Sequence, residues 1–196
     1  MQIRFLTAAA SLLLATLVPA QNKGTDKAPA AAPSMPTPKP GPEHEQLAKA
    51  EGTWDVAVER QGMAPSKGTA EMKMSLNGFW LTEKFTCDMG TMAFEGHNVT
   101  GYDPLKKKYV STWVDNMGPN MIVTEGVFDP KTRTLTMVGD GVDMAGNKVK
   151  MRNLTIHKDA NTVLFEMYHT GADGKEAKVM TITYTRRGSA PGKPAK

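Results

Sequence analysis

The chain has 196 residues, with 24 basic against 20 acidic side chains and a formal charge of +4. A nucleic-acid-binding surface would gather basic and aromatic residues on one face, whereas these lysines fall in turns and in two tails, so we exclude nucleic acid as a partner. A single cysteine, Cys87, excludes an internal disulfide. Packing and closure of the sheet must therefore supply the stability.

Residues 1–20 predict a secretory signal peptide. Arg4 precedes an apolar stretch from Ala8 to Val18, and small residues stand before a cut after Ala20. The alternative is an N-terminal membrane anchor, but the stretch is short for a span, which needs roughly 20 residues. We therefore expect a secreted or periplasmic protein whose mature chain has no integral membrane segment.

Two segments rich in alanine, proline and lysine flank a single predicted domain. Residues 21–42 predict a disordered Ala/Pro-rich linker, and residues 188–196 a disordered tail. Between them, residues 43–187 are long enough to bury about two thirds of the chain surface. This domain begins with a short helix, because Pro42 suits a first turn and Gly52 a helix end.

From Trp54 onward the apolar period becomes two, which is typical of strands. Turn signals such as Asn77-Gly78 and Asp103-Pro104 separate the runs. The predicted strands are Trp54–Arg60, Thr69–Leu76, Phe79–Cys87, Met92–Tyr102, Tyr109–Asp115, Met121–Phe128, Thr134–Val138, Lys148–His157, Thr162–His169 and Ala177–Arg186. We expect an all-β fold, an antiparallel up-and-down meander of about ten strands. Closure as a barrel is favoured over two sheets because it removes the edges.

Polar side chains interrupt several of the apolar faces. Glu83 alternates with Phe85, and Glu125 with Val123 and Val127. A buried carboxylate is costly unless it is paired, and ligand cavities combine apolar walls with a few polar groups. The predicted ligand-binding residues are Glu83, Glu125, Trp113, Tyr184, Asn153 and His169. Two alternatives stay open: structural pairing of the carboxylates with Arg152 or a tyrosine, and faces that point outward at a subunit contact.

Sulfur and imidazole side chains are the candidate metal ligands of this sequence. The residues considered for Cu(I) are Met72, Met74, Cys87, Met89 and Met92, and those considered as an axial haem ligand are His157 and His169. Methionine on strand faces is usually a gap filler, and the four histidines lack metal-ligand spacing. We therefore expect no metal and no other cofactor. The chain also carries no recognised catalytic motif.

Several motifs resemble a family of bacterial proteins known only as domain of unknown function 1579, over about residues 42–187. They are Gly52-Thr53-Trp54, Gly101-Tyr102-Asp103-Pro104, Trp113-Val114-Asp115 and Tyr184-Thr185-Arg186. The resemblance implies a calycin-like, or lipocalin-like, barrel. In such a barrel Trp54 would plug the closed end, with Arg186 rather than Arg187 stacked on it.

The resemblance also implies a function by analogy of fold. We expect an exported barrel that binds a small apolar or amphipathic ligand and is not an enzyme. One alternative is a barrel enzyme in which burial raises the pKa of Glu83 or Glu125 so that it acts as a general base. Another is a structural or interaction barrel with a filled interior. Whether copies of the chain form a homo-oligomer stays open.

Overall fold

The computed structural model describes residues 37–90, 92–143 and 145–188. The predicted signal peptide, most of the predicted linker and the predicted tail beyond residue 188 lie outside the described residues. The described chain from Pro38 onward belongs to one compact unit.

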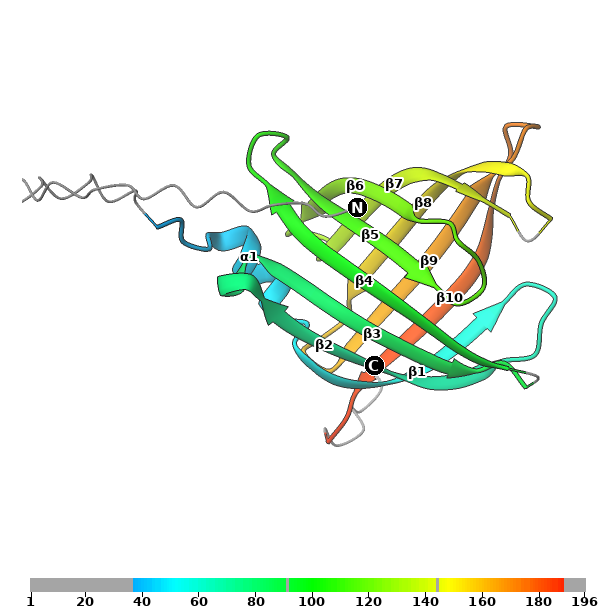
Figure 1. The fold of residues 1–196 in the computed structure, drawn as a ribbon, viewed down its shortest axis with the longest axis horizontal. Helices are drawn as coiled ribbons and strands as arrows, with labels where there is room; N and C mark the ends of the chain where they lie inside the picture. The colour runs from blue at the N-terminus through cyan, green and yellow to red at the C-terminus, as the bar shows by residue number, and fades with distance from the viewer. Residues whose placement is uncertain (1–36, 91, 144, 189–196) are drawn as a thin grey trace, which may run out of the picture. The chain divides into compact units, whose positions relative to one another are not determined.

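One short α-helix and ten strands follow one another along this unit (Figure 1). The elements are α1 (Pro42–Ala48), β1 (Gly52–Arg60), β2 (Ser66–Ser75), β3 (Trp80–Asp88), β4 (Ala93–Asp103), β5 (Lys108–Asp115), β6 (Ile122–Asp129), β7 (Thr134–Val142), β8 (Lys148–His157), β9 (Thr162–Thr170) and β10 (Glu176–Arg186). A 3₁₀ turn at Leu76–Gly78 joins β2 to β3, where the Asn-Gly pair predicted a reversal.

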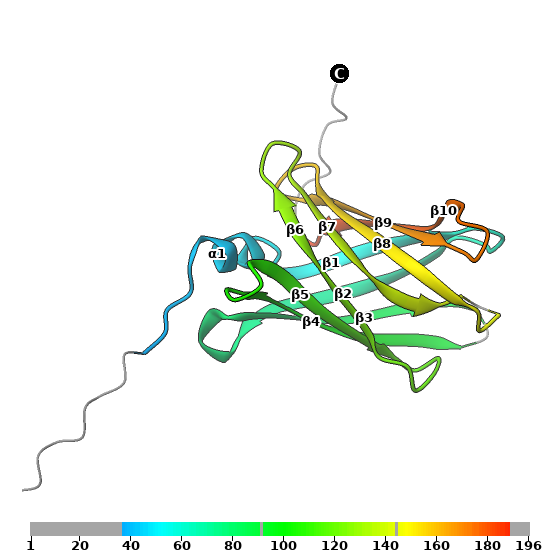
Figure 2. The same cartoon turned by 90° about the horizontal axis from the view of Figure 1, so that it is seen from above.

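Every strand pairs antiparallel with the next, and the last strand pairs with the first, so the sheet is a closed barrel. The closing pair runs from Trp54 opposite Arg186 to Arg60 opposite Met180. Helix α1 lies at one end, and the loops that join β1 to β2, β7 to β8 and β9 to β10 lie at the other (Figures 1 and 2). The predicted meander of ten strands closed as a barrel is confirmed.

Helix α1 covers one end of the barrel interior. Pro42 begins the helix, where its missing N–H has no intrahelical partner to lose. Leu47 is its buried residue and packs in a cluster with Leu81, Tyr109 and Met137. Gly52 then adopts a positive φ of 129°, which turns the chain into β1.

The inner face of the barrel follows the two-residue period. In β1, Trp54, Val56 and Val58 are 1%, 3% and 1% exposed, while their neighbours point outward. The main core cluster adds buried residues from β2, β3, β4, β9 and β10: Ala70, Phe85, Cys87, Phe94, Val163, Ile182 and Tyr184. The burial of Cys87 among apolar residues agrees with its alternation in the sequence.

Strand β7 is longer than the sequence indicated. Its predicted end was Val138, but the strand continues to Val142. The pattern Gly139-Asp140-Gly141 reads as a turn, yet here the glycines make room for a neighbouring strand. A Cβ on Gly141 would lie 2.2 Å from the sulfur of Met151 in β8. The glycine therefore serves close packing rather than a reversal.

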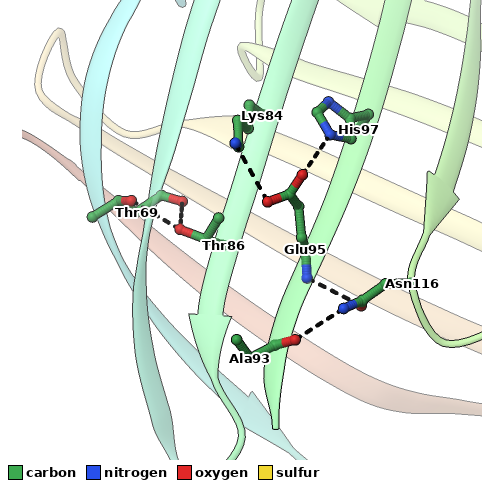
Figure 3. A network of polar contacts seen from close by, with 7 residues as sticks. All are labelled: Thr69, Lys84, Thr86, Ala93, Glu95, His97 and Asn116. Carbon is green, nitrogen blue, oxygen red and sulfur yellow. Dashed lines mark hydrogen bonds and ion pairs between the residues drawn. The ribbon is translucent and has the colours of Figure 1, made fainter.

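The outer face carries polar networks between strands, one of which Figure 3 shows. The Glu95 carboxylate in β4 lies 3.3 Å from the Lys84 ammonium in β3 and 3.0 Å from Nε2 of His97. Asn116, just beyond β5, accepts a hydrogen bond from the Glu95 backbone N–H and donates one to the carbonyl of Ala93. The start of the β5–β6 loop is thereby fastened to β4.

Candidate functional site

The barrel encloses a cavity of about 1560 Å³. Its wall at the α1 end includes Leu47 and His157, and at the other end it reaches the loops through Gln61 and Met117. We call this second, loop-bearing end the mouth. A side-chain-filled interior, the third possibility that the sequence left open, does not agree with a cavity of this size.

Glu83 is a carboxyl group of this wall that lies away from both ends of β3. It extends from β3, and its carboxyl Oε1 accepts a hydrogen bond of 3.2 Å from the Tyr184 hydroxyl in β10, with β2 and β1 lying between these two strands in the sheet. Burial raises the pKa of Glu83 from 4.5 to about 7, and the bond from Tyr184 lowers it only in part. Burial, with the nearby Glu83 carboxyl, also holds the pKa of Tyr184 well above its usual range. The accessible surface left to Glu83 faces the cavity.

Glu83 and Tyr184 can therefore both donate and accept hydrogen bonds inside the barrel. Near pH 7 the Glu83 carboxyl is present in protonated and ionised forms, because its pKa lies there. A protonated carboxyl offers one O–H donor and a carbonyl acceptor, while an ionised one only accepts. The cavity thus holds a carboxyl that can exchange a proton with a bound molecule.

A second polar group lies beside Glu83 on β4 and β5. Asn98 stands opposite Glu83 in the register of β3 and β4. Its amide donates to the Ser111 hydroxyl at 2.7 Å, and Thr100 donates to the Asn98 carbonyl oxygen at 2.6 Å. These side chains satisfy one another's hydrogen-bonding groups. They form a polar strip on the wall that does not require a ligand as a partner.

Two buried polar atoms of the wall have no hydrogen-bond partner among the described residues: Oδ1 of Asn153 in β8 and Nε2 of His169 in β9. Both residues line the cavity. Burial lowers the pKa of His169, opposed by the nearby Asp143 carboxylate, which favours a neutral ring. An unpartnered buried polar atom costs roughly 1–3 kcal/mol, so each is a place where a ligand group could bond.

Trp113 forms an aromatic part of the wall near the mouth. Its ring stacks on Phe94 with centroids 6.3 Å apart and meets the edge of Phe85 at 6.1 Å. Its indole N–H donates to the Asp115 carboxylate at 2.8 Å. The indole is thus held in place and presents an apolar surface to the cavity.

Glu125 does not line the cavity, and the predicted facing of β6 is wrong. The face shared by Met121, Val123 and Val127 is exposed, with 62%, 56% and 55% of these side chains accessible. The Glu125 carboxylate lies on this outer face, 2.5 Å from the ammonium of Lys108 and 3.0 Å from that of Lys106. These lysines lower its pKa.

The inner face of β6 carries the less apolar set: Ile122, Thr124, Gly126 and Phe128. Gly126 has no side chain here because a Cβ would lie 1.8 Å from the carbonyl oxygen of Thr136 in β7, and Thr124 is polar, so only Ile122 and Phe128 mark this face as apolar. The valine-bearing face of β6, which the alternation predicts to be the inner one, is the outer one.

Trp54 and Arg186 meet at the α1 end of the barrel. The Arg186 guanidinium lies over the Trp54 ring at 4.1 Å from its centroid, a cation–π contact. The same guanidinium donates to the backbone carbonyls of Lys49, at 2.8 Å, and of Ala160, at 3.1 Å. Arg187 instead pairs with Asp55 on the outside. Trp54 and Arg186 therefore pack together at the α1 end, where Trp54 also forms part of the cavity wall.

Arg60 is a residue of the cavity wall that the sequence analysis did not single out. Its Nε donates to the thioether of Met180 at 3.4 Å and its Nη1 to that of Met89 at 3.5 Å. Its guanidinium also lies 5.5 Å from the Phe94 ring centroid. The sequence did carry a signal, because Arg60 continues the inward alternation of Trp54, Val56 and Val58.

The described residues contain no group of three or more His, Cys, Asp and Glu side chains that could hold a metal ion. The two histidines considered for haem line opposite ends of the cavity, His157 near α1 and His169 near the mouth. No helix in the described part of the chain is long and apolar enough to cross a membrane.

Fold and site together define a class: a ten-stranded closed β-barrel with an internal, partly polar cavity. Residues 39–186 match the model of the family described as "Protein of unknown function (DUF1579)", and the chain belongs to this family. No curated protein matches the sequence.

Solved structures similar to this chain are β-barrels of low sequence identity. An S-type phycobiliprotein lyase, CPES, from Guillardia theta has 9% identity and a TM-score of 0.50, covering 77% of this chain and 100% of its own. A de novo designed fluorescence-activating β-barrel has 12% identity and a TM-score of 0.41, covering 72% and 96%. At this identity the lyase indicates a shared fold alone.

Proposed function

We propose that this protein is an exported, calycin-like binding barrel that holds a small apolar or amphipathic ligand in its cavity. The single observation that carries the proposal is the cavity of about 1560 Å³, whose largely apolar wall is interrupted by a few convergent polar groups. Export rests on the signal-peptide pattern of residues 1–20, and the calycin-like class on the Gly52-Thr53-Trp54 start with Arg186 at the end.

The polar groups indicate what the ligand offers. Asn153 presents an unpartnered acceptor, Oδ1, so the ligand should carry a donor such as a hydroxyl or an amide N–H. Glu83 and Tyr184 add a second polar point across the interior. We propose these residues, with Trp113 and His169, as the ligand-binding set, acting on a molecule that is otherwise apolar.

A pair of neighbouring residues in β6 offers a matched test. Thr124 is 7% exposed and lines the cavity, whereas Val123 next to it is 56% exposed on the outer face. Replacing Thr124 with tryptophan should fill part of the cavity, while Val123→Trp should leave it open. The measurement is binding of an apolar fluorescent probe, Nile red, together with native mass spectrometry of each variant purified from the host.

We expect the wild type and Val123→Trp to bind the probe alike and to carry the same co-purifying molecule, and Thr124→Trp to lose both. Thermal unfolding of each variant shows that the barrel is folded. Equal occupancy of folded Thr124→Trp and Val123→Trp would mean that the probe sits outside the cavity, and the proposal would fail.

A second candidate function, a barrel enzyme, is favoured by one observation: the carboxyl of Glu83 has a pKa of about 7 and faces a cavity. A general acid or base works best with a pKa near the working pH. Turnover of the co-purifying molecule by the wild type but not by Glu83→Gln, which keeps its shape, would support this role. Binding without turnover would reject the enzyme and leave the binding barrel as the proposed function.

A homo-oligomer stays a prediction. The exposed apolar face of β6, with Met121, Val123 and Val127, is consistent with a contact between copies. Sedimentation velocity of the wild type against Val123→Lys measures it, since a contact through this face should be lost in the variant.

A further inference from the structure

Arg60 differs from the other charged groups of the described barrel in what surrounds it. It is half-buried at the mouth end of β1, and the partners found for its guanidinium are two thioether sulfurs and the face of Phe94. Thioether sulfur is a weak acceptor, and a guanidinium has five N–H donors. Among the described residues no carboxylate lies within ion-pair distance of Arg60, and its other N–H groups have no hydrogen-bond partner among these residues.

Three carboxylates that line the cavity near the mouth already have donors of their own. Asp115 accepts from the indole of Trp113 and from the backbone N–H of Met117. Asp140 pairs with Lys150 at 2.5 Å. Asp143 accepts from the backbone and side chain of Asn147. None of them is directed at Arg60.

A half-buried cation without a protein anion can gain a charge-assisted pair with an anionic ligand, and such pairs are among the stronger hydrogen bonds in proteins. We propose that Arg60 binds the carboxylate head of an amphipathic ligand whose apolar tail lies in the cavity. The inference rests on the proposed binding function and deepens it, because it assigns the class of ligand and the direction in which the ligand lies.

The geometry of β1 and β10 sets that direction. Arg60 stands opposite Met180, and Val56 stands opposite Tyr184. Four residues of strand span about 13 Å, so a head at Arg60 lies roughly that far from the level of Tyr184. The space between is walled by Val58 and Ile182, both buried and apolar. A tail can therefore run inward from Arg60 toward the Glu83–Tyr184 pair.

A series of amphiphiles with one chain length separates head from tail. The probes are dodecanoate, dodecan-1-ol and dodecyltrimethylammonium, each below the concentration at which it forms micelles, with dissociation constants measured by isothermal titration calorimetry. We expect the wild type to bind dodecanoate on the order of tenfold or more tighter than dodecan-1-ol, since hydrogen bonds to charged groups have that effect. The ammonium should bind more weakly than the alcohol.

Arg60→Met keeps the length and apolar stem of the side chain and removes the charge. It should abolish the preference for dodecanoate while leaving the binding of dodecan-1-ol unchanged, and the latter also shows that the variant is folded. Arg60→Lys should keep part of the preference, because an ammonium attracts the anion without a bidentate bond.

Lys148, an exposed cation that also lines the mouth, provides the matched control. Lys148→Met should keep the full preference for dodecanoate. Equal losses in Lys148→Met and Arg60→Met would mean general attraction at the mouth and would overturn the assignment, as would an unchanged preference in Arg60→Met. If the wild type binds none of the amphiphiles, the proposed function itself fails. If the wild type binds dodecan-1-ol tightly but does not prefer dodecanoate, only the assignment of a carboxylate head to Arg60 is rejected, and the proposed binding function stands.

Discussion

The hydroxyl of Tyr184 donates a hydrogen bond of 3.2 Å to the carboxyl of Glu83 across the interior of the barrel. Two strands, β1 and β2, separate the partners in the sheet, so the bond joins inward-facing side chains of strands that are not neighbours. It joins two groups that would each be costly to ionise in this place, because burial raises the pKa of both. The protonation of Glu83 is therefore the property of the site that is most open to measurement.

The first prediction concerns stability against pH. The folded state holds the Glu83 proton more tightly than the unfolded chain, since the pKa rises from 4.5 to about 7. This group therefore makes stability fall as the pH rises from about 4.5 towards 7, after which the loss is complete. Glu83→Gln lacks this loss and should gain up to about 3 kcal/mol relative to the wild type between pH 5 and 8.

Urea unfolding of both proteins across this range measures that difference. Half-buried His157 and His169 have lowered pKa values and act in the opposite direction, but they are present in both proteins and cancel in the comparison. A constant difference between the two proteins from pH 5 to 8 would show that Glu83 ionises as freely as it does in water.

The second prediction concerns Tyr184 itself. Its hydrogen bond lowers the pKa of Glu83, against the larger effect of burial. Tyr184→Phe removes the bond and keeps the ring, so the pKa of Glu83 should rise above about 7. Titration of the Glu83 side-chain carbon by NMR measures it. A fall of the pKa would mean that water enters the space left by the hydroxyl and solvates the carboxylate.

The third prediction tests the closed end. Trp54 is 1% exposed and lies between Tyr184 and the guanidinium of Arg186. Trp54→Ala should cost roughly 3–5 kcal/mol, the usual range for emptying the site of a large buried aromatic side chain. Denaturant unfolding measures the loss, which a value below about 1 kcal/mol would contradict.

The fourth prediction concerns a close approach between β6 and β7. A Cβ on Gly126 would lie 1.8 Å from the carbonyl oxygen of Thr136, a backbone atom that cannot rotate away. Gly126→Ala should therefore push the two strands apart and cost about 1–3 kcal/mol or more. Thermal unfolding measures the cost. Gly118→Ala is the comparison for the loss of a glycine, because a Cβ on Gly118 would come no closer than 3.9 Å to another side chain. An unfolding midpoint equal to that of the wild type would mean that the strands are further apart than described.

The fifth prediction follows from the outward position of Glu125. Glu125→Gln removes two exposed ion pairs with Lys106 and Lys108, which solvent screens. The unfolding midpoint and the occupancy of the cavity should both stay close to those of the wild type. A variant that folds but loses its ligand would contradict the outer placement of this carboxylate.

Much of the fold could be predicted because strand period and turn chemistry are local properties. Asn77-Gly78 marked the β2–β3 reversal, where Asn77 and Gly78 have φ values of 61° and 81°. Closure could be predicted from the number of strands and the lack of disulfides. The end of β7 could not, because the role of Gly141 depends on the position of Met151 in another strand.

The site was harder to predict from the sequence than the fold. Which face of a strand points inward depends on the whole barrel and not on the strand alone. The alternation in β3 indicated an inner face for Glu83, and its carboxyl faces the cavity. The same reasoning failed in β6, where valines occupy the outer face and Thr124 the inner one. The rule that the more apolar face of a strand points inward does not hold next to a cavity. Side chains that border open space need not be large and apolar, because they do not have to fill a core. Arg60 was overlooked because a charged residue at a strand end usually points to solvent.

The closing pair of strands has a consequence for how the protein is made. Strand β10 pairs with β1, and the backbone N–H of Arg187 bonds to the carbonyl of Thr53, more than a hundred residues earlier. During synthesis, β1 and β9 are therefore both unpaired edges until the last strand has emerged. The nascent chain cannot complete the barrel in pieces, and its period of greatest exposure to aggregation ends when Arg186 reaches Trp54.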